Sequence, residues 1–321
     1  MTPKIHKNLF KFGRYSSGAL RLAFSKVYGP LWRKHALEKF EKESDFFRGK
    51  IYERVSYYNK LISPFQNEDL PYTVDSFRKN CSTSYYLDLK PLLNCYPGNL
   101  RFSAQMGDIR NIPDVPSFVK SRPIDGDNKN SVLLKLNQVR HYYTYPDKTM
   151  FSDKIGKVVW RGACHQPNRQ AFVKEFYNKS FCDVGDVNKS SIGMPYHKSF
   201  MSIPDQLKFK YILSLEGNDV ATNLKWIMAS NSLCFMPKPI FETWFMEGLL
   251  IPGYHYVELN PDLSDLEEKV DYYNSNELEA VEIINNANSY SKMFFDASAE
   301  NIVSFLVVDR YFDLSKGVFL K

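Results

Sequence analysis

Glycine and short polar residues interrupt an apolar run between residues 210 and 232, in the stretch KYILSLEGNDVATNLKWIMASNS. Residues 216–219 form the break, and apolar residues then resume with helical spacing. A strand that leads into a helix through such a turn can present unpaired backbone N–H groups and the positive end of a dipole to an anion. We therefore expect Gly217 to lie near a bound anion, whereas Asp219 can cap the helix with no ligand present.

Two arginines flank another candidate turn. Arg161 and Gly162 follow the apolar run VVW, and Arg169 opens the next segment of helical pattern. Glycine permits a close backbone approach, and two guanidinium groups near a helix N-terminus can bind a diphosphate through paired hydrogen bonds. The alternative is that one arginine pairs with a carboxylate and the other is solvated, and for this turn taken by itself the alternative is favoured.

Polar side chains also follow the other strand-like runs. Asn223 can hydrogen-bond a ribose or phosphate, and Lys225 can neutralise phosphate charge. Lys238 and Glu242 lie on a proline-bounded loop after LCFM, where a carboxylate suits the paired hydroxyls of a ribose or sugar. Glu242 can instead be a surface residue that caps the next helix. The residues that these turns offer to a diphosphate, ribose or sugar are Arg161, Gly162, Arg169, Gly217, Asn218, Asp219, Asn223, Lys225, Lys238 and Glu242.

Alternating strands and helices must position these turns. The strand-like segments are GKVVWRGA, FCDVGDV, KFKYILSLEG, SLCFMP and YHYVELN, and the helix-like segments are NRQAFVKEFYNKS, ATNLKWIMASN, LSDLEEKVDYYNSN and ELEAVEIINNANSYSKMFF. This alternation over residues 158–295 predicts right-handed βαβ units and a parallel sheet, in which ligands lie beyond the carboxyl ends of the strands. Nearer the N-terminus, residues 17–62 read as helical with a break at Pro30, while SYYLDLKPLL and NLRFSAQMGD read as strands.

Composition limits the class of protein. The chain has 321 residues, which favours two domains over one, and its apolar share of 44% is ordinary for a soluble globular protein. Its five cysteines include no C-x-x-C pair, which argues against a disulfide framework or a zinc site and for a reducing compartment. No apolar run of about 18 residues predicts a membrane span. Phosphate-loop and dinucleotide glycine motifs are absent too, which argues against nucleotide hydrolysis and dinucleotide redox chemistry.

Two further patterns give weaker signals. Asp125 and Asp127 form the Asp-x-Asp pattern with which many sugar transferases hold a divalent metal and a nucleotide diphosphate. The surrounding IDGDNKN is also a run of turn-forming residues, however, and the turn is favoured. Cys164 beside His165 is a poor nucleophile candidate because adjacent residues rarely face one another. We expect no metal and no other cofactor.

Basic residues concentrate at the N-terminus. Residues 1–37 contain no Asp or Glu and eight cations, which are Lys4, Lys7, Lys11, Arg14, Arg21, Lys26, Arg33 and Lys34. Because the whole chain carries a formal charge of +6, the remaining residues sum to −2. Apolar and aromatic residues interleave with these cations, so the segment can lie on an anionic membrane surface. An equal alternative is a solvated helix whose apolar side packs on the body of the protein; no motif accompanies the charge to indicate a nucleic-acid partner.

Four segments taken together resemble glycosyltransferase family 90: VVWRGACHQPNRQAF, KYILSLEGNDVATNLKWIMASNS, ETWFMEGLLIPGYHYVEL and DLSDLEEKV. The similarity runs from about residue 100 to 295, and VKSRPIDGDN and LLKLNQVRHYY are most similar to the bacterial branch, which includes lipopolysaccharide-core transferases. The resemblance implies an α/β fold of the GT-B type, in which two Rossmann-like domains face each other across a cleft and the second holds most of the donor. It also implies an inverting, metal-independent transfer.

The resemblance also assigns positions within the donor site. Arg161 and Arg169 match the family's donor-phosphate motif, and residues 217–225 match its nucleotide-binding segment. The animal enzymes carry an arginine where this chain has Asn223, so the phosphate contact is expected to be weaker or made differently here.

The general base is less well defined by the resemblance. The animal branch has an aspartate before x-Pro, where this chain has Asn111. The candidate bases are therefore the neighbouring carboxylates Asp108 and Asp114, and Asp108 is preferred because it ends an apparent strand. A cap or turn role for either aspartate is equally open. Ser121 and Arg122 are expected on the acceptor side.

Four parts are expected along the chain: a basic helical segment (1–62), an acceptor-side α/β domain (63–152), a Rossmann-like domain that binds a nucleotide sugar (153–295), and a C-terminal helix or tail that packs back on the first domain (296–321). The predicted enzyme moves a hexose or pentose from a UDP-sugar to a hydroxyl of a bacterial surface glycan, in particular lipopolysaccharide core. It would act as a peripheral protein on the cytoplasmic face of the inner membrane, with a glycan or glycolipid acceptor. The alternative is a non-catalytic nucleotide- or glycan-binding protein on the same fold, which the missing family aspartate favours.

Overall fold

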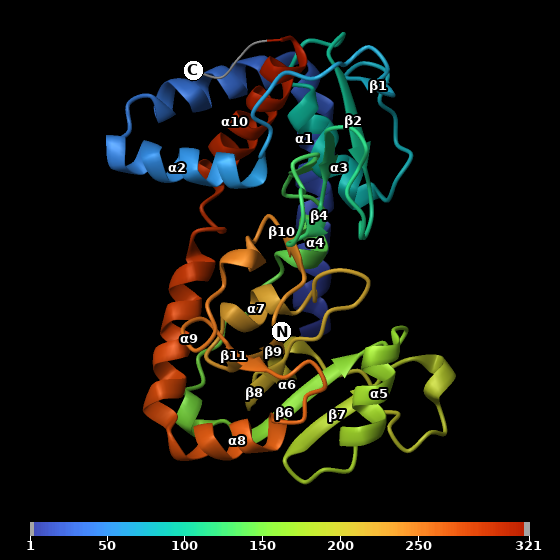
Figure 1. Ribbon diagram of the computed structural model, residues 1–321, viewed down its shortest axis with the longest axis vertical. Helices are drawn as coiled ribbons and strands as arrows, with labels where there is room; N and C mark the ends of the chain where they lie inside the picture. Colours follow the sequence, from blue (N-terminus) through green and yellow to red (C-terminus); the bar gives the residue numbers. More distant parts are fainter. Residues whose placement is uncertain (1–2, 318–321) are drawn as a thin grey trace. The chain divides into compact units, whose positions relative to one another are not determined.

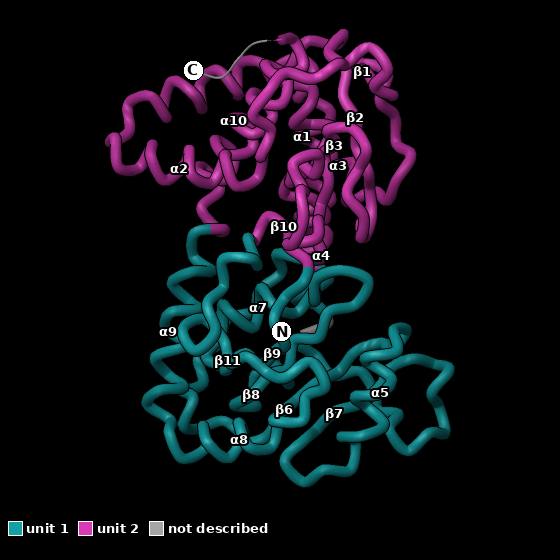
Figure 2. Tube along the Cα trace, viewed as in Figure 1, with its two compact units in different colours: residues 1–8, 141–240, 246–293 teal, residues 9–140, 241–245, 294–321 magenta. Residues whose placement is uncertain are grey.

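The protein has a mixed α/β fold, as predicted (Figure 1). Its computed structural model describes residues 3–317, without the side chains of Pro3 and Lys4. The first two residues and the Lys4 side chain of the predicted basic segment, and residues 318–321 of the predicted tail, therefore lie outside the described residues. The described chain forms two compact units (Figure 2). Unit 1 comprises residues 3–8, 141–240 and 246–293, and unit 2 comprises residues 9–140, 241–245 and 294–317.

Five parallel strands form the sheet of unit 1, in the order β11-β9-β8-β6-β7. They are β6 (Ile155–Gly162), β7 (Cys182–Asp186), β8 (Phe209–Leu213), β9 (Leu233–Pro237) and β11 (Val257–Leu259). The register aligns Val159 with Ile212, and Ile212 with Cys234. Four of these strands lie within the predicted strand-like segments, and β6 begins one residue before GKVVWRGA. The prediction of a parallel sheet is confirmed.

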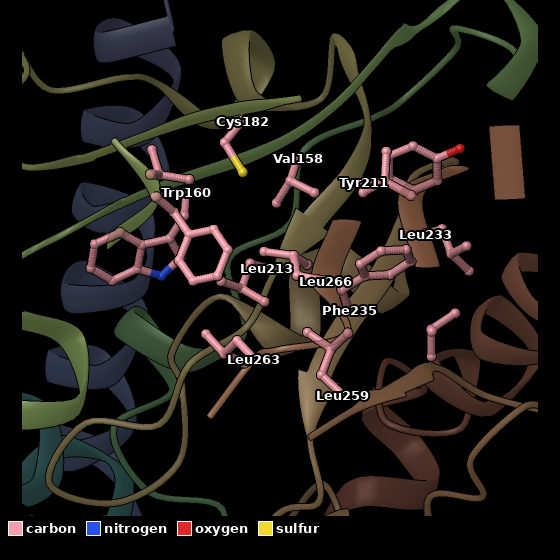
Figure 3. Close-up of a cluster of buried hydrophobic side chains, with 14 of the residues drawn as sticks. Val158, Trp160, Cys182, Tyr211, Leu213, Leu233, Phe235, Leu259, Leu263 and Leu266 are labelled. Atoms are coloured by element: carbon pink, nitrogen blue, oxygen red, sulfur yellow. The ribbon is translucent and has the colours of Figure 1, made fainter. Parts of the chain in front are cut away.

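Apolar side chains from all five strands form the core of unit 1 (Figure 3). Every residue of β8 is buried, as expected for a parallel strand whose two faces are both covered. Trp160, Tyr211 and Phe235 are the large aromatic residues that the sheet contributes to this cluster. The helices of unit 1 are α5 (Pro167–Phe176), α6 (Ile203–Gln206), α7 (Leu224–Met228), α8 (Leu266–Ser275) and α9 (Glu277–Lys292), with 3₁₀ turns η1 (Phe151–Asp153), η2 (Lys189–Ser191) and η3 (Glu247–Leu249).

Helix α7 is shorter and begins later than the sequence predicts. It starts at Leu224 and has five residues. The residue at its N-cap position is Asn223, so the expectation that Asp219 caps this helix is wrong. The reason is that Asn223 turns back to the strand: its side-chain amide donates a 2.9 Å hydrogen bond to the carbonyl oxygen of Leu213, and the chain bends before the helix can begin.

Unit 2 contains a four-stranded sheet in the order β1-β2-β3-β5 and a separate antiparallel pair, β4 with β10. Strands β2, β3 and β5 are parallel, and β1 is antiparallel at the edge. The strands are β1 (Tyr72–Thr73), β2 (Arg101–Gln105), β3 (Ser117–Val119), β4 (Ser121–Pro123), β5 (Ser131–Leu133) and β10 (Phe241–Thr243); the helices are α2 (Asp45–Tyr58), α3 (Thr83–Leu93), α4 (Gln138–His141), which ends at the unit boundary, and α10 (Ala297–Ser315). Helix α10 packs against α2.

The long N-terminal helix α1 (Pro3–Phe40) continues through Pro30, so the predicted break there is wrong. Proline in a helix interior costs about 3 kcal/mol, and tertiary packing on both sides of Pro30 offsets this cost. Gly29 lies against Cys95, and Arg33 forms an ion pair of 2.7 Å with Asp309. No helix among the described residues is long and apolar enough to cross a membrane.

Helix α3 occupies most of the segment SYYLDLKPLL, which the sequence analysis assigned to a strand. That assignment is wrong. Tyr85, Leu89 and Leu92 recur at helical spacing and are buried along one side of the helix. Packing of this apolar side within unit 2 decides the conformation of the segment over its local preference.

Candidate active site

Arg161, in the last residues of β6, forms an ion pair with the neighbouring strand β7. Its Nη2 lies 2.6 Å from Asp183 Oδ1, its Nη1 donates to the Asp183 carbonyl oxygen at 2.6 Å, and only 6% of the side chain is exposed. Burial tends to raise the pKa of Asp183, but hydrogen bonds from Lys198 and Arg161 outweigh it and hold that pKa below its ordinary value. The structure therefore shows, for Arg161, the carboxylate pairing that the sequence left open.

Gly162 provides space beside the same strand. A Cβ at this position would come within 2.5 Å of the Trp160 ring. The indole thus lies directly over the backbone of Gly162, and its other neighbours include the Arg169 guanidinium, 5.7 Å from the ring centroid. The glycine at this turn is required by packing, since any larger residue would displace the tryptophan.

Arg169, on the first turns of α5, reaches across to the end of β8. It donates hydrogen bonds to the carbonyl oxygens of Leu215 at 2.6 Å, Glu216 at 3.2 Å and Ala163 at 3.3 Å. A Cβ on Gly217 would lie 3.1 Å from Arg169 Nη2. The structure therefore brings together two of the predicted donor residues, Arg169 and Gly217, at the carboxyl ends of neighbouring strands.

Three hydrogen bonds fix the loop between β8 and α7. Gly217 N donates to the carbonyl oxygen of Asp219 at 2.9 Å, and Asp219 is 3% exposed. Asn218 is exposed, and its Oδ1 accepts a 2.9 Å hydrogen bond from Gln166 Nε2. Glu216 Oε1 accepts from the backbone N–H of Ile240, which links this loop to the one after β9. Lys238 is exposed on that second loop.

Lys225 lies inside unit 1 and not at its surface. Its side chain is 0% exposed, and its Nζ lies 2.5 Å from Oε1 of Glu247, which is 1% exposed. A buried ammonium paired in this way has its charge compensated within the protein. Lys225 thus holds α7 to the segment that contains η3.

Arg122 and Glu242 were assigned to different substrates, and the structure joins them. They face each other in the register of β4 with β10, and Arg122 Nε lies 2.7 Å from Glu242 Oε1. The two side chains are 0% and 1% exposed. Glu242 also accepts a hydrogen bond from the Tyr57 hydroxyl, and Arg122 donates to the carbonyl oxygens of Tyr57 and Ser131. Both side chains are therefore enclosed, and their charged groups are hydrogen-bonded by other residues of unit 2.

Ser121 and Lys60 are two further polar residues in the part of unit 2 that contains Arg122. Ser121 is 0% exposed, and its hydroxyl donates to the carbonyl oxygen of Ile109 at 3.5 Å. Lys60 donates to Asn128 Oδ1 at 2.9 Å. Burial lowers the pKa of Lys60, and the positive charge of Arg122 lowers it further, against the opposing effect of Glu242.

Asp108 and Asp114, the two candidate bases, occupy different environments. Asp108 lies beyond the end of β2 and forms an ion pair of 2.6 Å with Lys120. Lys120 is 2% exposed, whereas 28% of the Asp108 side chain reaches solvent. Asp114 is exposed, and its carbonyl oxygen accepts a hydrogen bond from Asn130. Asp108 is thus oriented by a buried cation and remains accessible to solvent.

The Asp125–Asp127 segment is a bend in which Gly126 has a φ of +86° and Asp127 pairs with Lys129 at 2.7 Å. Among residues 3–317, no group of three or more His, Cys, Asp or Glu side chains could hold a metal ion. At Cys164, burial and the negative charge of Asp186 raise the thiol pKa to about 12, against the effect of Arg169. That thiol stays protonated at neutral pH, which makes it a poor nucleophile.

Three contacting residues were missed by the sequence analysis. Lys120 stands two positions before Arg122 in VKSRPIDGDN, so the resemblance of this segment to the bacterial branch was a usable signal. Asp183 lies on the strand next to Arg161, and the predicted adjacency of these strands could have found it. Tyr57 gave no signal, because its contact with Glu242 joins residues 185 positions apart.

The amino-acid sequence that contains these contacts is similar to the sequences of known proteins. A sequence model of glycosyl transferase family 90 matches residues 134–311, more than half of the chain. O-glucosyltransferase LpsA from Dichelobacter nodosus is 46% identical over 318 residues, which cover 98% of this chain and 99% of that protein. The chain belongs to glycosyltransferase family 90. Protein O-glucosyltransferase 2 from Danio rerio is 30% identical to this family 90 chain over 143 residues, 42% of this chain and 28% of that protein.

Membership of family 90 makes the protein a glycosyltransferase. It also decides between the two hypotheses of the sequence analysis in favour of the enzyme. The family match includes the turns from Arg161 to Glu242, whereas Asp108 and Arg122 precede it. Those two lie in the part of the chain that the bacterial relative also covers.

Proposed function

We propose that this family 90 enzyme transfers a hexose or pentose from a UDP-sugar to a hydroxyl of a bacterial surface glycan, specifically lipopolysaccharide core. A relative of nearly the same length is called an O-glucosyltransferase, which supports glucose as the first sugar to test. One structural observation supports the donor site more than any other. Arg169 and Gly217 meet at the carboxyl ends of β6 and β8, and nucleotides bind at that edge of parallel sheets.

The proposed reaction is a single displacement with inversion in a GT-B architecture. The acceptor hydroxyl oxygen attacks the anomeric carbon while the bond from that carbon to the UDP oxygen breaks. A carboxylate takes the hydroxyl proton, and UDP leaves with the bonding electron pair. In this proposal unit 1 supplies the donor-binding domain and unit 2 the acceptor-binding one.

Asp108 is the proposed general base. Its carboxylate is held 2.6 Å from Lys120 and is partly open to solvent. Lys120 acts as a positioning residue, because its buried ammonium fixes the carboxylate in one place. Asp114 is the second candidate, and its exposure gives it no comparable orientation.

Cationic side chains take the place of a metal in this proposal. Arg169, on α5, hydrogen-bonds the loop after β8, and Lys238 lies on the loop that Glu216 links to it; the positive charge of both would stabilise the diphosphate as it leaves. Arg161 can add to this only where a diphosphate competes with Asp183 for its guanidinium.

The proposed location is the cytoplasmic face of the inner membrane, on which the protein would be peripheral. The cations of residues 1–37, with no acidic residue among them, support binding to an anionic lipid surface. Such a location would bring the site to an acceptor that is itself part of a glycolipid.

Release of UDP from a panel of UDP-sugars tests the proposal, measured in EDTA with a truncated lipopolysaccharide-core oligosaccharide as acceptor. We expect release from UDP-glucose that depends on the acceptor, and a product whose anomeric configuration, read by NMR, is opposite to that of the donor. Release that appears only after a divalent metal is restored would contradict the metal-independent mechanism. Acceptor-dependent release from nucleotide sugars of another base, and none from UDP-sugars, would contradict the donor.

A further inference from the structure

Helix α1 packs on unit 2 through its small residues. A Cβ on Gly18 would lie 3.2 Å from Leu87, and one on Gly29 would lie 3.0 Å from Cys95 Sγ. Between them, Ser25 is fully buried and its hydroxyl accepts a 2.9 Å hydrogen bond from Asn94. These positions are spaced seven and four residues apart, so they share one side of the helix. Close approach of the backbone at these small residues therefore helps to hold α1 in place, together with the buried ring of Phe40 at its C-terminal end.

Another side of α1 exposes large apolar residues, and Tyr28 and Trp32 at its edge line a groove with Ser298 and Asn301 at the start of α10. We call this side the outer face, and its members with their exposed fractions are Leu20 (60%), Phe24 (51%), Val27 (69%), Tyr28 (47%), Leu31 (61%) and Trp32 (39%). Their spacing of three and four residues makes a continuous stripe over more than three turns. The rings of Tyr28 and Trp32 are stacked with centroids 6.5 Å apart. Soluble helices place such residues inward, so this face requires an occupant.

The charges around the outer face indicate which occupant fits. Arg33 is used internally by Asp309. Lys26 and Lys34 form only loose, exposed ion pairs of 3.8 Å with Asp75 and Glu38, and 79% and 72% of their side chains remain exposed. Residues 1–37 hold no acidic side chain. A second copy of the same helix would bring two basic segments together, which costs energy, whereas an anionic surface attracts them. Aromatic residues with one polar end also suit the boundary between headgroups and acyl chains.

We propose that the outer face of α1 inserts into the headgroup region of an anionic bilayer, with the helix axis parallel to the membrane plane. The partner is the lipid surface itself, and the inference rests on the proposed membrane location. It adds to that location a specific set of apolar residues, and it predicts an attachment that is only partly electrostatic. Helices that lie in the membrane interface owe their binding to both buried apolar area and cationic attraction.

Trp32 reports on the insertion directly. The other three tryptophans, Trp160, Trp226 and Trp244, are 3%, 7% and 1% exposed, so a change in emission on lipid binding must come mainly from Trp32. With vesicles of phosphatidylglycerol and phosphatidylethanolamine we expect a blue shift of the emission that Trp32→Phe abolishes. A reduced shift should remain in about 0.5 M NaCl, which screens surface charges within a few Å. Binding without a shift, or binding that salt removes completely, would overturn the proposal.

Paired variants separate insertion from catalysis. Phe24→Ser with Leu31→Ser should weaken vesicle binding at least about tenfold, since insertion depends on buried apolar area. The matched control, Phe46→Ser with Leu278→Ser, removes residues that are 73% and 89% exposed on α2 and α9 and should leave vesicle binding unchanged. UDP release with a soluble acceptor should be the same in all three proteins, so a failure of the proposed transfer would show there and not in the vesicle assay. Equal vesicle binding by both double variants, or conversion of a dimer to a monomer by the first with no Trp32 shift in the parent protein, would contradict insertion.

Discussion

The loop after β8 in unit 1 and the β4–β10 pair in unit 2 carry similar residue types in different settings. In the loop, the hydrogen bonds of Arg169 run to backbone carbonyl oxygens, and the side chain remains partly exposed. In the pair, Arg122 and Glu242 are enclosed, with 0% and 1% of their side chains exposed. Arg169 is still reachable from solvent, so it can contact a ligand. Arg122 is enclosed with a carboxylate, so its role is to stabilise the fold.

The largest expected effect is the loss of activity when Asp108 is replaced. Asp108 is the solvent-accessible member of the pair with Lys120 and is the proposed general base. Asp108→Asn should lower kcat by about 10²–10⁴, the usual contribution of a general base. It should also lower the free energy of unfolding, by less than Glu242→Ala does, because the buried Lys120 ammonium keeps only a neutral amide oxygen in place of the carboxylate. Steady-state UDP release measures the first and urea unfolding the second. Asp114→Asn, which removes the exposed carboxylate, is the control; a larger loss of kcat in that variant would reverse the assignment.

Glu242→Ala should be the most destabilising of the variants considered. It leaves the Arg122 guanidinium buried without its carboxylate, and breaking a buried pair in this way costs about 3–5 kcal/mol. Urea unfolding measures the loss. Asp127→Ala breaks the exposed pair with Lys129 and should leave the free energy of unfolding almost unchanged. A stable Glu242→Ala protein with weakened donor binding would show that this carboxylate serves the ligand, and the contrast between the two regions would fail.

Lys225→Met tests whether unit 1 also contains a residue of the enclosed kind. The change leaves Glu247, 1% exposed, with no ammonium beside it, and we expect a loss of about 3 kcal/mol in the free energy of unfolding. The double variant with Glu247→Leu removes both charges and should recover most of that loss. If the double variant is no more stable than the single one, the two residues do not act as a pair.

Gly217→Ala should weaken the donor site with little cost to the fold. The added Cβ would lie 3.1 Å from Arg169 Nη2 and displace the guanidinium from the loop. An overpacking penalty of about 1–3 kcal/mol at the site corresponds to a rise of about tenfold or more in the KM for the donor. Gly49→Ala, where a Cβ meets open space on α2, is the matched control. An unchanged KM would remove the loop from the donor site.

The smallest expected effect is a loss of stability at acid pH, caused by protonation of Asp183. Its pKa in the folded protein is depressed, because the hydrogen bonds from Lys198 and Arg161 outweigh burial. The stabilisation is therefore present above the unfolded pKa of about 3.9 and is lost as the pH falls through the folded value. Asp183→Asn should be less stable than the parent protein by at most about 1 kcal/mol at pH 7, and the difference in Tm should shrink as the pH falls below about 3.9. A difference that grows on acidification would contradict this account of Asp183.

Much of unit 1 could be predicted from sequence, because its parallel strands are short apolar runs bounded by polar turns. The same pattern located the turns that follow β6, β8 and β9. In unit 2 the local pattern was misleading: SYYLDLKPLL has the composition of a strand and forms α3, and α1 continues through Pro30 because of contacts with distant residues. In both segments, packing against distant residues determines the secondary structure more strongly than the local preference of the sequence does.

The candidate site was predicted by residue type better than by partner. Arg122 and Glu242 lie 120 positions apart, and only the register of β4 with β10 shows that they meet. Lys225 fits helical spacing and a phosphate-binding role equally well, and its burial beside Glu247 cannot be seen in the sequence. Residue type indicates which charges are present, and the fold determines which of them are compensated.

Hydrogen exchange with and without saturating UDP tests most directly where the donor binds. The account predicts slower exchange of backbone amides in peptides that cover residues 160–170 and 214–224, around Arg169 and Gly217, because ligand contact suppresses local opening. Peptides that cover β4 and β10 should exchange at the same rate in both conditions, since that pair is enclosed without the ligand. Protection confined to β4 and β10, with the loop after β8 unaffected, would contradict the assignment of the donor site to unit 1.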